Sequence, residues 1–135
     1  MGRFVILVLA VTTHMSGWAV ASDNFAGTWT GTVNGQPAVT LRIENPKASH
    51  CGEATLYTQA NDNGTWRVAG ALTQPMTSCT TNGNVLVFRT KYYASRGSSD
   101  LVEHKYWISV ESMSTAVLRS SSGNMRAHPI RLERK

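Results

Sequence analysis

The sequence contains no apolar run long enough to cross a bilayer as a helix, which takes about 20 residues. It also lacks the 3.6-residue hydrophobic period of a long amphipathic helix and a basic face with nucleic-acid readout elements. There is no Gly-x-Ser-x-Gly elbow, and the histidines lack the close spacing common in metal sites. We therefore expect no membrane span, no nucleic-acid partner, no metal or other cofactor and no enzymatic activity.

The N-terminus has the pattern of a secretory signal peptide. Arg3 supplies a positive charge, the apolar run FVILVLAV follows at 4–11, and an Ala-x-Ala cleavage pattern ends at Ala21. Cleavage before Ser22 removes one of the basic residues, leaving a mildly basic chain with a length that suits one domain. We predict a signal peptide at 1–21, a single domain at 22–135 and a periplasmic or extracellular location.

Cysteine is scarce. The two cysteines, Cys51 and Cys79, both follow the predicted signal peptide. An even number of cysteines in an exported chain predicts a disulfide. The alternatives are two buried free thiols, or a zinc site in which His50 joins the two cysteines.

The rest of the chain reads as short strands separated by turns. Period-two alternation is clearest where Val39, Leu41 and Ile43 alternate with polar residues. Asn34-Gly35 and Asn63-Gly64 are typical of tight turns. Residues 74–83 are predicted to form a loop. The predicted strands are 27–33, 38–44, 53–59, 65–72, 84–92, 103–111, 115–120 and 126–133.

Eight strands joined by short connections favour an all-β, antiparallel, up-and-down barrel, because closure removes the exposed edges of the sheet. A two-sheet sandwich is the alternative.

The two ends of the domain resemble known families. Gly27-Thr28-Trp29 is similar to the Gly-x-Trp first strand of lipocalins and related calycin-like barrels. That resemblance implies that Trp29 plugs one end of the barrel and that an arginine near the last strand packs on it. Arg131 is the nearest candidate, with Arg126 and Arg119 as alternatives. The chain also resembles small β-barrel modules that precede hydrolase domains in exported bacterial proteins, since its last strand reads Ile-Arg-Leu-Glu-Arg.

Large aromatic rings are the candidate ligand-binding groups. Rings inside a barrel either fill the core or line a pocket for an apolar ligand. Trp66 and Tyr106 share the phase of aliphatic neighbours and are expected to face inward. The candidate ligand-binding residues are Trp66, Tyr106, Tyr57 and Phe88.

Two functions follow from this interpretation. The first is an exported binding protein for a small apolar or amphipathic molecule. The second is a protein-interaction module, such as an exported inhibitor or accessory subunit, with its core packed solid. A general acid–base pair needs two of the separated carboxylates to meet across the sheet. Those carboxylates are Glu44, Glu53, Glu103 and Glu111.

Overall fold

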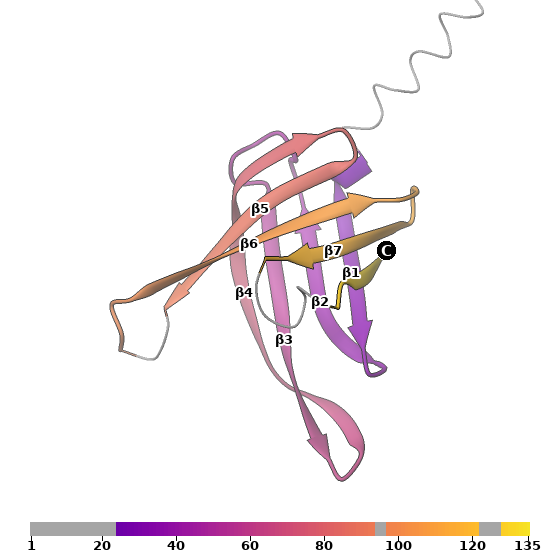
Figure 1. Cartoon of the computed structure of the whole chain (residues 1–135), viewed down its shortest axis with the longest axis vertical. Helices are drawn as coiled ribbons and strands as arrows, with labels where there is room; N and C mark the ends of the chain where they lie inside the picture. Colours follow the sequence, from indigo (N-terminus) through magenta and orange to yellow (C-terminus); the bar gives the residue numbers. More distant parts are fainter. Residues whose placement is uncertain (1–23, 94–96, 122–127) are drawn as a thin grey trace, which may run out of the picture.

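The computed structural model describes residues 24–93, 97–121 and 128–135, so the predicted signal peptide lies outside the described residues. Eight antiparallel strands follow one another around a closed barrel, and the last strand pairs with the first (Figure 1). This confirms the barrel over the sandwich. The strands are β1 (Gly27–Val33), β2 (Gln36–Ile43), β3 (Gly52–Asp62), β4 (Thr65–Asn82), β5 (Val85–Tyr93), β6 (Leu101–Val110), β7 (Thr115–Ser120) and β8 (Ile130–Arg134).

Two predicted turns are present. Asn34 and Gly35 connect β1 to β2 with φ angles of 57° and 75°. Asn63 and Gly64 connect β3 to β4 with φ angles of 55° and 92°. Asparagine and glycine tolerate this left-handed region better than other residues, so the turn chemistry sets the register of both hairpins.

The prediction of a loop at 74–83 is wrong, because β4 continues through Asn82. Pro75 pairs in register with Glu53 of β3, and the registered pairs between β4 and β5 begin only at Thr77. A proline without an N–H is tolerated where no neighbouring strand needs that donor. The pairing with β5 then shifts at a bulge that contains Ser78, at a φ of 52°. This part of β4 resembles a loop in sequence because it contains a proline and the residues of a bulge.

One half of the barrel is packed solid. Its core lies between the N-terminal turn, formed by Asn24 and Phe25, and the middle of the strands, and Trp29 is fully buried at its end. The indole Nε1 of Trp29 donates a hydrogen bond to the Phe25 carbonyl at 2.9 Å, which supplies the partner that a buried indole needs. Around Trp29 the fully buried apolar side chains include Phe25, Leu41, Met76, Leu86, Phe88, Ile108, Leu118 and Leu132.

Arg134, and not Arg131, packs on Trp29. The guanidinium carbon of Arg134 lies 4.3 Å from the centroid of the indole ring. Alternation along β8 explains the correction, because Leu132 and Arg134 face inward whereas Arg131 faces outward. Arg131 pairs instead with Glu111 at 3.2 Å on the outer surface. Of the alternatives, Arg119 pairs in register with Trp107, and Arg126 lies outside the described residues.

The predicted disulfide between Cys51 and Cys79 is present at the packed end. Both cysteines are buried. Two backbone hydrogen bonds join the same segments, from the Cys51 N–H to the Met76 carbonyl at 3.1 Å and from the Cys79 N–H to the Ser49 carbonyl at 2.9 Å. The connection between β2 and β3 is therefore fastened to the bulge in β4.

The other half of the barrel is wider. Between β4 and β5 the registered pairs run from Asn82 and Val85 to Thr77 and Arg89, and none follows in the described residues. Beyond this point the two strands diverge (Figure 1). The β3–β4 and β5–β6 hairpins extend away from the packed core on either side of the divergence. No helix in the described ranges has the length and apolar character needed to cross a membrane.

Candidate ligand-binding cavity

A cavity of about 950 Å³ occupies the wide half of the barrel. This volume lies at the upper end of the range for pockets that hold drug-sized molecules. Part of its wall is apolar and comes mainly from β1, β3, β4 and β8. The apolar lining residues are Val33, Ala38, Leu56, Trp66, Leu72 and Ile130.

Another part of the wall is polar and comes from β4 to β7. On β5, β6 and β7 the inward-facing positions are apolar in the packed half and become polar at the level of the cavity. On β6, for example, the inward-facing residues from the core toward the cavity are Ile108, Tyr106 and His104. Polar groups inside a barrel are costly unless they have partners, so their gathering at one level indicates a site. The polar lining residues of β4 to β7 are Gln74, Tyr92, His104, Tyr106 and Ser120.

A row of rings leads from the core into this wall. Phe88 stacks on Tyr106 with centroids 5.2 Å apart, and His104 lies next to Tyr106 at 6.3 Å. The Tyr92 ring is parallel to His104, and its hydroxyl is hydrogen-bonded to His104 Nε2 at 2.8 Å. Burial raises the pKa of the Tyr106 phenol above its ordinary value.

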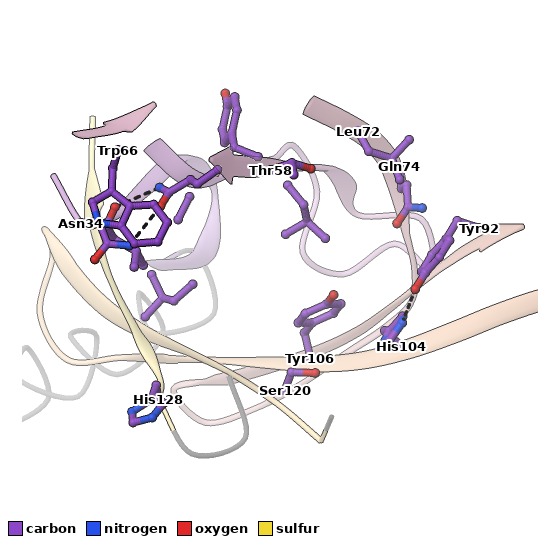
Figure 2. Close-up of a pocket in the computed structure, with 16 residues that line it drawn as sticks. Asn34, Thr58, Trp66, Leu72, Gln74, Tyr92, His104, Tyr106, Ser120 and His128 are labelled. Carbon is purple, nitrogen blue, oxygen red and sulfur yellow. Dashed lines mark hydrogen bonds between the residues drawn. The ribbon is translucent and has the colours of Figure 1, made fainter. Parts of the chain in front are cut away.

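Two glutamines of the cavity wall differ in how their amides are used. Gln59 donates from Nε2 to the carbonyls of Val33, Gln36 and Pro37, and so fastens β3 to the β1–β2 hairpin. Gln74 is only 4% exposed, and neither its Nε2 nor its Oε1 has a hydrogen-bond partner in the part of the chain that the structure describes. Figure 2 shows Gln74, Tyr92 and His104 toward one side of the cavity and Trp66 and Asn34 toward the other.

The structure brings three of the four predicted ligand-binding residues to this cavity. Tyr106 is a buried part of its wall. Trp66 lies on the extended β3–β4 hairpin and is 37% exposed, so it belongs to the wall and not to the packed core. Tyr57 also lines the cavity, and its hydroxyl is within 3.2 Å of Thr40 Oγ1. Phe88 is buried in the core behind Tyr106 and does not line the cavity.

Sequence reasoning missed Gln74, Tyr92, His104 and Ser120 as wall residues. Gln74 fell in the predicted loop. The signal for His104 was present in the sequence, because it shares the phase of Tyr106 and Ile108 on one strand. A polar residue at an apolar phase inside a strand is the pattern that would have indicated a polar cavity wall.

Two of the carboxylates considered for acid–base chemistry lie in ion pairs with arginines. Glu53 pairs with Arg42, and Glu103 lies 2.8 Å from Arg89. These ion pairs are solvent-exposed and join neighbouring strands. Across the described residues, no three His, Cys, Asp or Glu side chains gather in a group that could hold a metal ion.

The chain matches no protein-family model, no curated protein and no solved structure. The closed eight-stranded barrel is consistent with the calycin-like architecture that the Gly-x-Trp resemblance implied. Membership of the lipocalin family has no support in these comparisons.

Proposed function

We propose that this protein is exported and binds a small apolar or amphipathic molecule in the wide half of its barrel. The observation that carries the proposal is the cavity of about 950 Å³, which combines an apolar wall with a few convergent polar groups. Binding sites for small molecules have this composition. A barrel built only for rigidity would continue its apolar packing to both ends.

The division of the barrel supports this role. The plug, the disulfide and the apolar core all lie in the packed half. A binding site held by a rigid scaffold loses little conformational entropy when a ligand enters. The disulfide also supports export, since disulfides persist in oxidising compartments. The sequence pattern at 1–21 supports the same location.

We propose binding without catalysis. The wall of the cavity consists mainly of aliphatic, aromatic and amide side chains. Glu53, Glu103 and Glu111 lie in ion pairs outside this wall, where they join strands instead of facing a substrate.

A protein partner is the second candidate function. Val68 and Leu72 are 36% and 49% exposed on the β3–β4 hairpin, beside Trp66. Exposed apolar side chains on a projecting hairpin are typical of contact surfaces. On this alternative, the hairpin contacts another polypeptide and the cavity is part of the interface.

Native mass spectrometry of the protein from the exported fraction of its host separates the two functions. An added mass of a few hundred daltons supports the small ligand, whereas a bound second polypeptide supports the alternative.

Fluorescence provides the direct binding test. An apolar ligand should quench tryptophan emission saturably through Trp66, and Trp66→Phe should remove most of the response. Trp107→Phe is the matched control and should retain it, because Trp107 is not among the wall residues. The absence of a response across a broad ligand panel would contradict the proposal.

A further inference from the structure

The amide of Gln74 is buried in the wall of the cavity without a partner among the described residues. Gln74 is 4% exposed and lines the cavity, and no described residue forms a hydrogen bond to either of its amide atoms. A buried polar group without a partner destabilises the folded state. Gln59 shows what a structural glutamine looks like in the same wall, since its amide serves three backbone carbonyls.

The hydrogen-bonding groups of a glutamine amide define which chemical group can pair with it. Its Nε2 donates and its Oε1 accepts, so full pairing needs a group that accepts and donates side by side. A carboxamide does both, and so does a carboxylic acid in its protonated form. An ester or ether accepts only, and an ammonium donates only.

The charge of the cavity decides between these groups. None of the described residues that line the cavity is Asp, Glu, Lys or Arg. A charged head buried there would lose its hydration without gaining a counter-ion of fixed charge. A carboxylic acid would have to hold its proton at neutral pH, whereas a carboxamide is neutral throughout.

The remaining wall is suited to a hydrocarbon chain. Leu56, Ile130 and Val33 belong to the apolar wall, and the Trp66 ring lies toward the side opposite Gln74 (Figure 2). An amphipathic molecule can therefore place its head at Gln74 and its chain along the apolar strands.

Resting on the ligand-binding function proposed above, we infer that Gln74 recognises the head of the ligand, and that this head is a neutral carboxamide on an aliphatic chain. The polar neighbours Tyr92 and His104 bond to each other, whereas neither amide atom of Gln74 has a partner among the described residues.

The test compares three probes with the same chain: decanamide, methyl decanoate and decanoate. Calorimetric titration of the purified protein at neutral pH should give an affinity for decanamide about tenfold above that for methyl decanoate, which is the effect of about one additional hydrogen bond. Decanoate should bind more weakly than decanamide.

The variant Gln74→Leu should reduce the amide-over-ester ratio to about one while methyl decanoate still binds. Gln36→Leu is the matched control and should keep the ratio, because Gln36 is not a wall residue. Gln74→Met provides a second apolar replacement if the leucine variant does not fold.

The outcomes separate the two proposals. Equal binding of decanamide and methyl decanoate, tighter binding of decanoate, or a ratio that survives in Gln74→Leu would each overturn the role of Gln74 and leave the cavity as a binding site. Failure of all three probes to bind would overturn the inference about the head together with ligand binding by aliphatic amphiphiles.

Discussion

Arg134 joins the last strand of the barrel to the first by lying over the ring of Trp29, 4.3 Å from guanidinium carbon to ring centroid. Its Nε donates to the Met113 carbonyl at 2.6 Å, and its two terminal nitrogens donate to the carbonyls of Asn24 and Ala26. One guanidinium thus closes the seam between β8 and β1 and holds the N-terminal turn. A fork of fixed donors suits this task better than a single ammonium.

Replacing this guanidinium should destabilise the barrel. Arg134→Met keeps an unbranched side chain but removes the contact with Trp29 and leaves three carbonyls without their donors. We expect the free energy of unfolding to fall by about 2 to 4 kcal/mol. Urea unfolding monitored by circular dichroism measures this as a lower midpoint with the same slope.

Arg131→Met is the matched control on the same strand. Arg131 faces outward in an exposed pair with Glu111, so the control should change stability by no more than about 0.5 kcal/mol. Equal losses for the two variants would contradict the role given to Arg134.

The two glutamines of the cavity wall should respond to substitution in opposite directions. Gln74→Leu removes a buried amide to which no described residue bonds, so it should raise the free energy of unfolding by about 1 to 2 kcal/mol. Gln59→Leu removes the donor shared by three carbonyls and should lower it by about 1 to 3 kcal/mol. Chemical unfolding of both variants without ligand measures the difference, and a loss of stability in Gln74→Leu would argue for a structural role of that amide.

Stability should depend on the ionisation of Tyr106 at high pH. Burial raises the pKa of this phenol, so the folded chain holds the proton more tightly than the unfolded chain. The resulting stability is complete below the unfolded pKa of about 10 and is lost as the pH rises through the folded pKa. The free energy of unfolding measured from about pH 8 to about pH 11 should therefore fall less steeply in Tyr106→Phe than in the unchanged protein. Identical slopes would show that Tyr106 does not contribute.

Loss of the disulfide should weaken the packed half and spare the cavity. The bond between Cys51 and Cys79 spans a sequence separation of 28, which corresponds to about 3 to 4 kcal/mol in the chain-entropy treatment. In the double variant Cys51→Ala, Cys79→Ala the free energy of unfolding should be lower by that amount, which urea unfolding detects as a lower midpoint. Under conditions where it stays folded, its ligand affinity should match that of the unchanged protein, because neither cysteine lines the cavity. A parallel loss of affinity would show that the two halves are coupled.

Two glycines with ordinary backbone angles should differ in tolerance. A Cβ at Gly52 would lie 1.9 Å from the Arg42 carbonyl oxygen, whereas a Cβ at Gly70 meets nothing within 4 Å. Gly52→Ala should therefore cost more than about 3 kcal/mol, because the strands at the β2–β3 connection must separate. Gly70→Ala should change stability by less than about 1 kcal/mol. Thermal unfolding of the pair measures both, and similar melting temperatures would exclude the backbone clash at Gly52.

The elements that could be predicted from the sequence are those whose structure depends on residues close together in the chain. Period-two alternation and the Asn-Gly turns depend on neighbouring residues, so β2 and the two hairpins that carry these turns could be predicted. The two cysteines could be paired because only one pairing exists. The barrel followed from the number of strands and the short connections between them.

The parts that could not be predicted depend on relations between distant strands. The partner of Trp29 depends on which residues of β8 face inward, and a tail with several arginines gives no register until it pairs with β1. Which residues line the cavity depends on the height along the barrel axis at which each inward-facing side chain lies. Gln74 and Ser120 belong to strands far apart in sequence, and only closure of the barrel brings them to one cavity.

The divergence of β4 from β5 has a consequence for association between molecules. A strand edge without a partner is a template on which other chains can add, and natural proteins block such edges with proline and lysine. Pro75 stands on the unpaired edge of β4 and cannot donate to an added strand, and Lys91 stands on the facing edge of β5 beside Glu103. The unpaired edges of β4 and β5 can thus persist without becoming a site at which copies of the protein polymerise through their strands.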